Sequence, residues 1–343
     1  VSTTTTLLAL EGGLRLRQGA LTDLPSAATG NLRMIGARYP GGYDPLLGWV
    51  PAAGTSGDAN VWRKPVTIDA AGVRSNGAER PAGTGILAVG DSFTFGDEVG
   101  DRDTWPAQLE ALIGRPVING GVFGYGFDQI TLRAEALLDR FPVDTLVVSV
   151  IPHDVVRCEF AYRYAWKPYF AVVDGALALR NVPVPEPHRG APDESLAVRS
   201  MRRSFLADFV MRRLDPYGWP VPDSLRAHAE GEAVSRLLVD RLADGAEARG
   251  LSLLLVVQWV PGHAQRPIAG AVARARSRGM PVLRLEPVLR KLLDADGVPL
   301  RHLFTIHAKA GAPRAPGHMT AVGNGVVARA VAERLAAPAW VAH

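Results

Sequence analysis

The chain has 343 residues, of which 47% are hydrophobic and 21% charged, and these proportions are typical of a folded globular protein rather than a disordered or fibrous one. The formal charge of +4 arises from 38 basic and 34 acidic residues. The basic residues are scattered and not interleaved with aromatic ones, so we expect no nucleic-acid partner. The single cysteine, Cys158, excludes an intrachain disulfide framework and a cysteine-rich metal site.

The first 84 residues show no regular alternation of strands and helices. Residues 3–19 read TTTTLLALEGGLRLRQG, which we interpret either as a short amphipathic lead-in or as the stub of an upstream membrane anchor that is absent from this chain. On that second interpretation we expect an extracytoplasmic protein, either periplasmic, secreted or anchored, while a cytoplasmic location stays open as the alternative. Residues 31–81 are rich in glycine, proline and other turn formers, so we predict an irregular N-terminal extension with a few short strands over residues 1–84.

From Gly85 onward, apolar runs of strand length alternate with segments of helical period, which is typical of a parallel sheet with crossover helices. We predict strands at 86–89, 117–119, 145–151, 253–257 and 282–285, and helices at 105–113, 129–140, 232–249, 267–278 and 321–335. Thr320 is suited to cap the last helix. The fold class is therefore α/β: a three-layer α/β/α sandwich with a mostly parallel central sheet over residues 85–335, followed by a tail at 336–343.

This alternation stops between about residues 160 and 227. The segment contains aromatic residues, among them Tyr162 and Trp166, and the proline-rich stretch NVPVPEPHRGAP. Loops of this length in compact domains are usually lids or binding insertions. We therefore predict an insertion or lid within the α/β domain.

Ser92 lies in the sequence GDSFTFG, directly after the first predicted strand. Open parallel sheets bind ligands at the carboxyl ends of their strands, and the helix that follows would supply backbone N–H groups and the positive end of its dipole. This position suits a nucleophile whose attack generates an oxyanion. The alternative is a simple strand-to-helix turn capped by Asp91 or Ser92.

A serine hydroxyl is a weak nucleophile near neutral pH and needs a general base. His318 lies in the sequence GHMTAVGN, immediately before the last predicted helix. A loop at this edge of the sheet can reach the end of the first strand. The alternative is a histidine that only packs against the start of the helix or caps it.

Together these segments resemble the SGNH family, also called GDSL-like esterases, in which four sequence blocks supply a serine, a glycine, an asparagine, and an acid with a histidine. GDSFTFG matches the first block, residues 119–124 (NGGVFG) match the second, and GHMTAVGN matches the histidine part of the last. The resemblance covers about residues 85–335. It implies a serine ester hydrolase in which Ser92 attacks, His318 moves the proton, and the N–H groups of Ser92 and Gly124 hold the oxyanion.

Two positions depart from the family pattern. His153, in the sequence IPHD, stands where the family has its asparagine; an imidazole N–H can donate one hydrogen bond, so we expect His153 to complete the oxyanion hole, unless it only caps the strand end. Ala315 stands where the family has its aspartate. This favours a Ser–His dyad whose tautomer is fixed by a backbone carbonyl, or a carboxylate from elsewhere, such as Asp294 or Asp296.

Two aspartates in the family blocks, Asp91 and Asp154, are expected to orient loops rather than to react. A metal site built from His302, His307 and His318 fits neither a pair of ligands at i, i+4 on one helix face nor the HExxH motif. The glycine-rich stretch GGVFGYG lacks both GxGxxG and a P-loop lysine. We therefore expect neither a metal nor a cofactor.

The sequence thus predicts an esterase that removes acetyl or other small acyl groups from a carbohydrate or a similar O-acyl substrate, with a lipase-like substrate as the second choice. Tyr125, Tyr162 and Trp166 are the predicted substrate contacts, because aromatic faces suit sugar rings and acyl chains. Two alternatives stay open. One is an O-acyltransferase acting on a polysaccharide or glycoside, and the other is a glycan-binding module with a degenerate catalytic site.

Overall fold

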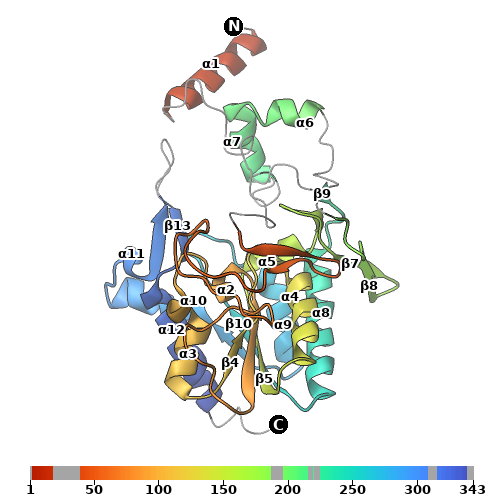
Figure 1. The fold of residues 1–343 in the computed structure, drawn as a ribbon. Helices are drawn as coiled ribbons and strands as arrows, with labels where there is room; N and C mark the ends of the chain where they lie inside the picture. The colour runs from red at the N-terminus through yellow and green to blue at the C-terminus, as the bar shows by residue number, and fades with distance from the viewer. Residues whose placement is uncertain are drawn as a thin grey trace.

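The computed structural model describes residues 2–17, 39–186, 196–214, 219, 225–307 and 315–337. Its centre is a five-stranded sheet in the order β11-β10-β5-β3-β4, in which every pairing is parallel (Figure 1). The strands are β3 (Gly85–Gly90), β4 (Val117–Asn119), β5 (Val143–Val150), β10 (Ser252–Val257) and β11 (Val282–Arg284). The predicted α/β class is confirmed, and each predicted strand lies within two residues of an observed one.

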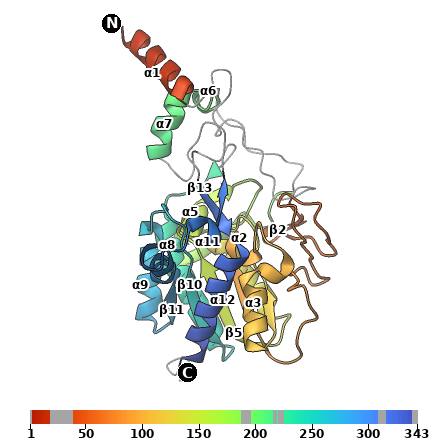
Figure 2. The same ribbon diagram turned by 90° about the vertical axis from the view of Figure 1, so that its left-hand side faces the viewer.

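Helices cover both faces of this sheet (Figures 1 and 2). On one face lie α3 (Trp105–Ile113), α10 (Leu285–Arg290) and α12 (Ala321–Ala336), and on the other lie α4 (Phe127–Leu138), α8 (Gly231–Glu247) and α9 (Ala269–Ser277). Thr320 caps α12 as predicted, since its hydroxyl accepts the N–H of Gly323 at 3.2 Å. The structure therefore has the three layers that the alternating sequence pattern indicated.

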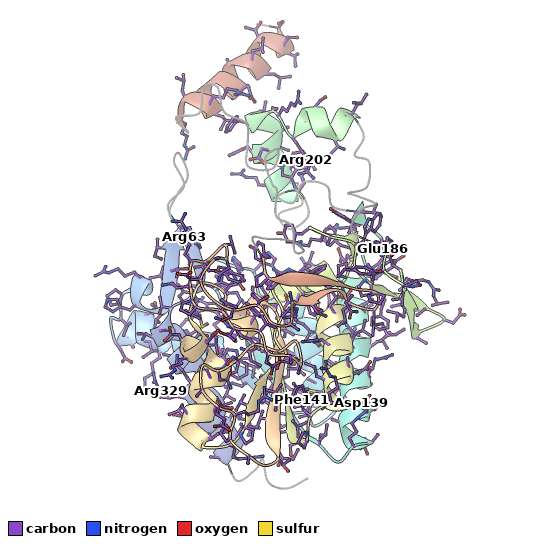
Figure 3. All side chains as sticks on the ribbon, viewed as in Figure 1. Arg63, Asp139, Phe141, Glu186, Arg202 and Arg329 are labelled. Carbon is purple, nitrogen blue, oxygen red and sulfur yellow. The ribbon has the colours of Figure 1, made fainter. Side chains whose placement is uncertain are left out.

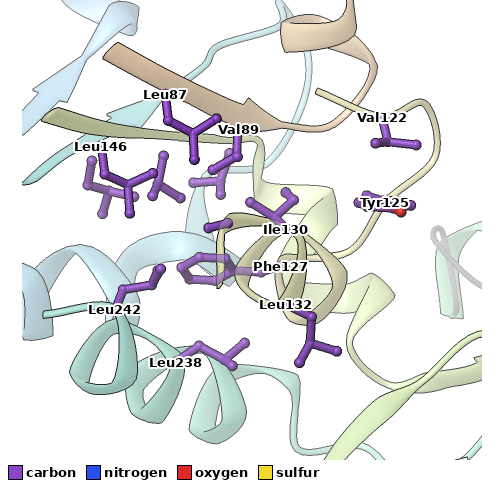
Figure 4. Packing of buried hydrophobic residues seen from close by; sticks show 14 of the residues in the cluster. Leu87, Val89, Val122, Tyr125, Phe127, Ile130, Leu132, Leu146, Leu238 and Leu242 are labelled. Carbon is purple, nitrogen blue, oxygen red and sulfur yellow. The ribbon is translucent and has the colours of Figure 1, made fainter. Parts of the chain in front are cut away.

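Successive side chains of a strand face opposite sides of a sheet, and here they enter two separate cores. In β3, Leu87 and Val89 belong to the core that contains Ile130 of α4 (Figure 4), whereas Ile86 and Ala88 belong to the core beneath α3 and α12. Because both faces are covered, β3 is buried along its whole length. This explains why the central strands read as continuous apolar runs.

The N-terminal extension is packed onto the α/β body over residues 39–84. It contains the short hairpin of β1 (Gly41–Asp44) and β2 (Gly48–Pro51), so short strands occur where they were predicted. Trp49, Ile68 and Val73 join the same core as β3. Residues 18–38 of the predicted extension lie outside the described residues.

Residues 3–17 form the helix α1 (Thr3–Arg17), none of whose residues is buried. It packs against α7 (Phe205–Leu214), where the carboxylate of Glu11 accepts the N–H groups of Phe205 and Leu206 at 3.0 and 2.8 Å. Among the described residues, no helix combines the length and the apolar character needed to cross a bilayer.

The mid-chain insertion contains regular elements rather than one long loop. The strand β6 (Phe160–Tyr162) pairs with β9 (Leu225–Arg226), and β7 (Tyr169–Val173) pairs with β8 (Ala176–Arg180). The helices α6 (Leu196–Met201) and α7 form, with α1, a layer beyond the carboxyl edge of the sheet, where Figure 3 labels Arg202. The described part of the proline-rich stretch ends at residue 186.

Short elements at the carboxyl edge complete the fold. The helix α2 (Ser92–Phe95) follows β3, and α5 (Pro152–Arg157) follows β5. The helix α11 (Leu300–Leu303) leads into the antiparallel hairpin of β12 (Phe304–His307) and β13 (Ala315–Met319), which precedes α12. One sheet edge thus collects the segments that the sequence marked as functional.

Candidate active site

Ser92 is the first residue of α2, directly beyond the carboxyl end of β3. Asp91 is the N-cap of this helix, because its carboxylate accepts the N–H of Phe93 at 3.0 Å. The capping interpretation therefore holds for Asp91 and leaves the hydroxyl of Ser92 available. Gly121 allows the loop after β4 to close on α2, since a Cβ at that position would overlap the backbone of Phe95.

His318 lies in β13, and its Nε2 is 2.8 Å from the Oγ of Ser92. The ring also packs against that of Phe93, with a distance of 4.9 Å between the ring centroids. The Ser92 residue is only 6% exposed, whereas the side chain of His318 is 26% exposed. The structure thus brings together the two residues that the sequence singled out, although 226 positions separate them.

The other nitrogen of His318 is held by Glu98, a residue that the sequence analysis missed. Glu98 Oε1 lies 3.0 Å from His318 Nδ1. A carboxylate from elsewhere in the chain was one of the two expectations, and Glu98 is such a carboxylate. The suggested Asp294 and Asp296 were wrong: both are exposed, and Asp294 pairs with Arg290 at 3.9 Å. The expectation of a backbone carbonyl on Nδ1 was also wrong, because a carboxylate occupies that place.

The charge of Glu98 fixes the tautomer of His318. Burial alone would raise the pKa of Glu98, but hydrogen bonds with His318 and Thr305 and the charges of the nearby histidines lower the pKa to about 2. An ionised carboxylate can only accept hydrogen bonds, so His318 Nδ1 carries the proton. In the neutral ring, Nε2 is then free to accept the hydroxyl proton of Ser92.

Carboxylates also raise the pKa of His318. Burial alone would lower the pKa of this imidazole, but its hydrogen bond with Glu98 and the charges of Asp97, Glu98 and Asp91 raise it above the usual value. Asp97 Oδ2 lies 3.9 Å from His318 Nε2, and burial raises the pKa of Asp97 itself to about 7. The site therefore stabilises the protonated histidine that proton transfer from Ser92 would create.

Glu98 accepts hydrogen bonds from three side chains. Besides His318, the hydroxyl of Thr305 donates to Oε2, and His307 Nε2 lies 2.9 Å from Oε1. His307 and His318 therefore share one carboxylate oxygen, and the two described strands β12 and β13 supply all three donors. Within the described ranges, no group of three or more potential metal ligands is found.

The segment that carries Glu98 is held by a buried guanidinium of the N-terminal extension. Arg74 is 1% exposed, and its Nη1 donates to the carbonyls of Phe95 and Gly96 at 2.7 and 2.6 Å, while its Nη2 donates to that of Val99 at 2.7 Å. Glu98 has a φ of 71°, a left-handed conformation that is unfavourable for a residue with a side chain. Arg74 thus stabilises a backbone path that presents Glu98 to the histidine.

The predicted oxyanion-hole residues lie on three segments at the same sheet edge: Ser92 at the start of α2, Gly124 in the loop after β4, and His153 in α5. Gly124 has a φ of 77°, which favours glycine, and no hydrogen bond from its N–H occurs among the described residues. His153 is the second residue of α5, and its ring lies 4.7 Å from that of His263. Burial, together with the charges of Arg157, His263 and Arg163, lowers the pKa of His153 to about 2. His153 is therefore neutral and carries one N–H donor.

The remaining predicted residues have different surroundings. Asp91 and Asp154 both pair with Arg157, at 3.3 and 2.6 Å, which fits their predicted part in orienting loops. Tyr125 is fully buried in the core, and its hydroxyl donates to the carbonyl of Trp49 at 2.5 Å. The prediction that Tyr125 contacts substrate was therefore wrong.

The other two predicted substrate contacts, Tyr162 and Trp166, lie in the insertion. Both are partly exposed, and their rings meet edge to face with 5.3 Å between the centroids.

Comparison with known proteins gives structural relatives only. No model of a known protein family matches this chain, and no curated protein is similar to it in sequence. Similar solved structures include a putative lipolytic protein of the G-D-S-L family from Desulfitobacterium hafniense DCB-2, with 17% identity over 74% of this chain and 100% of that one at a TM-score of 0.40.

Two further solved structures are similar to this chain to about the same degree. A lipase/acylhydrolase from Enterococcus faecalis shares 13% identity over 74% of this chain and 95% of its own, with a TM-score of 0.39. A catalytic mutant of Axe2, an acetylxylan esterase from Geobacillus stearothermophilus, shares 15% identity over 78% of this chain and 100% of its own, with a TM-score of 0.41.

Replacing Arg74 tests whether it positions Glu98. We expect Arg74→Met to lower kcat for ester hydrolysis by about 10²-fold with little change in KM, because a displaced acid no longer orients His318. The pH below which kcat/KM falls should also move to a lower value.

Arg133 is the matched control for this test. It is 4% exposed and donates to the carbonyl of Gly72 at 2.6 Å, so Arg133→Met loosens the same extension without touching the segment around Glu98. Equal kinetic losses in the two folded variants would contradict the positioning of Glu98 by Arg74.

Proposed function

We propose that this chain is a serine ester hydrolase that works through an acyl-enzyme, with Ser92 as nucleophile, His318 as general base and Glu98 as the acid that orients the histidine. The observation that carries this proposal is one continuous chain of hydrogen bonds, with 2.8 Å between Ser92 and His318 and 3.0 Å between His318 and Glu98. This is the order of groups that activates a serine hydroxyl. The resemblance of GDSFTFG and GHMTAVGN to SGNH blocks supports the same activity.

The reaction proceeds in two halves. Ser92 Oγ bonds to the ester carbonyl carbon while its proton passes to His318 Nε2, and the carbonyl oxygen becomes an oxyanion. When this intermediate collapses, the bond to the alcohol oxygen breaks and His318 returns the proton to the leaving alcohol. Water then attacks the acyl group on Ser92, with His318 again as base, and releases the acid.

The oxyanion accepts hydrogen bonds from the N–H groups of Ser92 and Gly124 and from the ring of His153. The side chain of Asp91 caps α2 through the N–H of Phe93, and no hydrogen bond from the N–H of Ser92 occurs within the part of the chain that the structure describes. A neutral His153 can donate without bringing a second full positive charge beside His318. Loss of one such donor costs about 3 kcal/mol, or two to three powers of ten in rate.

The substrate we propose is an O-acetylated carbohydrate. Support comes from the partly exposed aromatic pair of Tyr162 and Trp166, whose faces suit sugar rings, on the insertion that follows α5. Transfer to a sugar hydroxyl instead of water would use the same acyl-enzyme. An acyl donor supplied with and without a sugar acceptor separates the two, since hydrolysis releases free acid and transfer yields acylated sugar.

Labelling with a fluorophosphonate tests the proposal directly. We expect the folded protein to form a covalent adduct on Ser92, because the adjacent base raises the nucleophilicity of its hydroxyl. Ser92→Ala should remove the adduct, whereas the control Ser235→Ala, a buried serine of α8, should be labelled like the unaltered protein. No adduct on Ser92 in folded protein would contradict both enzymatic activities and favour the glycan-binding module.

The pH dependence tests the part assigned to Glu98. Below the raised pKa of His318 the ring is protonated and cannot accept the proton of Ser92, so kcat/KM should fall on the acid side. Glu98→Gln removes a charge that raises this pKa, so the acid limb should move to lower pH while kcat falls by about two to four powers of ten. Asp294→Asn is the control, and its rate and profile should stay unchanged. If the acid side of the kcat/KM profile does not shift in Glu98→Gln, another group orients His318.

A further inference from the structure

The guanidinium of Arg157 contacts the three segments that carry the proposed oxyanion donors. Its Nη1 lies 3.3 Å from Asp91 Oδ2, 2.9 Å from the carbonyl oxygen of Tyr125 and 2.6 Å from Asp154 Oδ1. These three acceptors come from the N-cap of α2, from the loop after β4 and from α5. Arg157 belongs to α5, so its contact with Asp154 lies within one helix, whereas its contacts with Asp91 and Tyr125 join α5 to two segments that lie far away in the sequence.

Each acceptor is the chain neighbour of one proposed donor. Asp91 precedes Ser92, Tyr125 follows Gly124, and Asp154 follows His153. Because Arg157 holds each of these neighbours, the adjacent peptide or side chain that donates to the oxyanion has little freedom to move. The relative positions of three hydrogen-bond donors thus depend on one side chain.

Burial strengthens the hydrogen bonds between Arg157 and its acceptors. The side chain of Arg157 is 11% exposed, and those of Asp91 and Asp154 are fully buried. Charge-assisted hydrogen bonds are stronger than neutral ones, and a buried carboxylate without its cation costs several kcal/mol. Arg157 and its acceptors are therefore expected to form a rigid unit, as an oxyanion hole requires.

We propose that Arg157 is the positioning residue of the oxyanion hole, which sets the spacing of the Ser92, Gly124 and His153 donors without touching substrate. This inference rests on the proposed function, because only a developing oxyanion gives that spacing a use. The charge of Arg157 also contributes to the lowered pKa of His153, after burial, and so favours the neutral ring with a single N–H.

The first test is the split between kcat and KM. We expect Arg157→Met to lower kcat by about 10²-fold, the loss typical of one oxyanion donor, while KM changes little, because the hole acts on the transition state. Arg157→Lys keeps a positive charge with several donors and should recover part of the loss. Arg133→Lys is the control, since that buried arginine donates to Gly72 instead, and its kcat should match the unaltered protein.

A double-mutant cycle separates positioning from a general loss of stability. If Arg157 acts in part through His153, Arg157→Lys should cost less in a His153→Ala background than in the unaltered protein. Binding of an alkyl boronate, which forms a tetrahedral adduct on serine, should weaken in parallel with kcat/KM. Arg157→Lys serves for all measurements if Arg157→Met does not fold.

The outcomes distinguish this inference from the proposed function. An unaltered protein that hydrolyses no ester and forms no fluorophosphonate adduct would end both. An active protein in which folded Arg157→Lys and Arg157→Met keep full kcat, or in which the cycle with His153→Ala is additive, would overturn the role of Arg157 alone.

Discussion

The hydrogen bond between His318 Nδ1 and the carboxylate of Glu98 is the interaction on which the rest of the site depends. Because Glu98 is ionised and can only accept, it places the proton of His318 on Nδ1 and turns the lone pair of Nε2 toward Ser92. Without this constraint the neutral ring would be free to adopt either tautomer, and the short contact with Ser92 would not by itself define a base. A single carboxylate therefore decides whether the serine is a nucleophile or only the start of a short helix.

Such a cluster of acidic groups is costly, and the fold offsets the cost with two arginines, the buried Arg74 and the largely buried Arg157. Asp91, Asp97 and Glu98 all lie close to one imidazole, and desolvation opposes the charge on each of them. Arg74 holds the backbone around Glu98, and Arg157 pairs with Asp91. The N-terminal extension supplies Arg74, so it is part of the proposed catalytic framework although it lies outside the α/β alternation.

The sequence predicted the parts of the site that depend on local signals. Ser92 follows a buried strand and His318 precedes a capped helix, and both positions could be placed at one sheet edge from chain order alone. Glu98 could not be found in this way, because its contact with His318 spans 220 positions and no fixed spacing marks it. The one local signal for Glu98 is Gly96, two residues earlier, whose left-handed conformation ends α2 and changes the direction of the chain. Tyr125 was misassigned because a sequence does not show whether an aromatic side chain next to a flexible glycine enters the core.

The most direct measurement is the proton NMR spectrum of the Nδ1–H of His318 in the unaltered protein. A histidine proton donated to a buried carboxylate resonates far downfield and exchanges slowly with water. We expect such a resonance, lost in His318→Gln, shifted strongly upfield in Glu98→Gln, and unchanged in Asp294→Asn. A spectrum without this resonance, or one that Glu98→Gln leaves unchanged, would contradict the hydrogen-bond chain from Glu98 through His318 to Ser92.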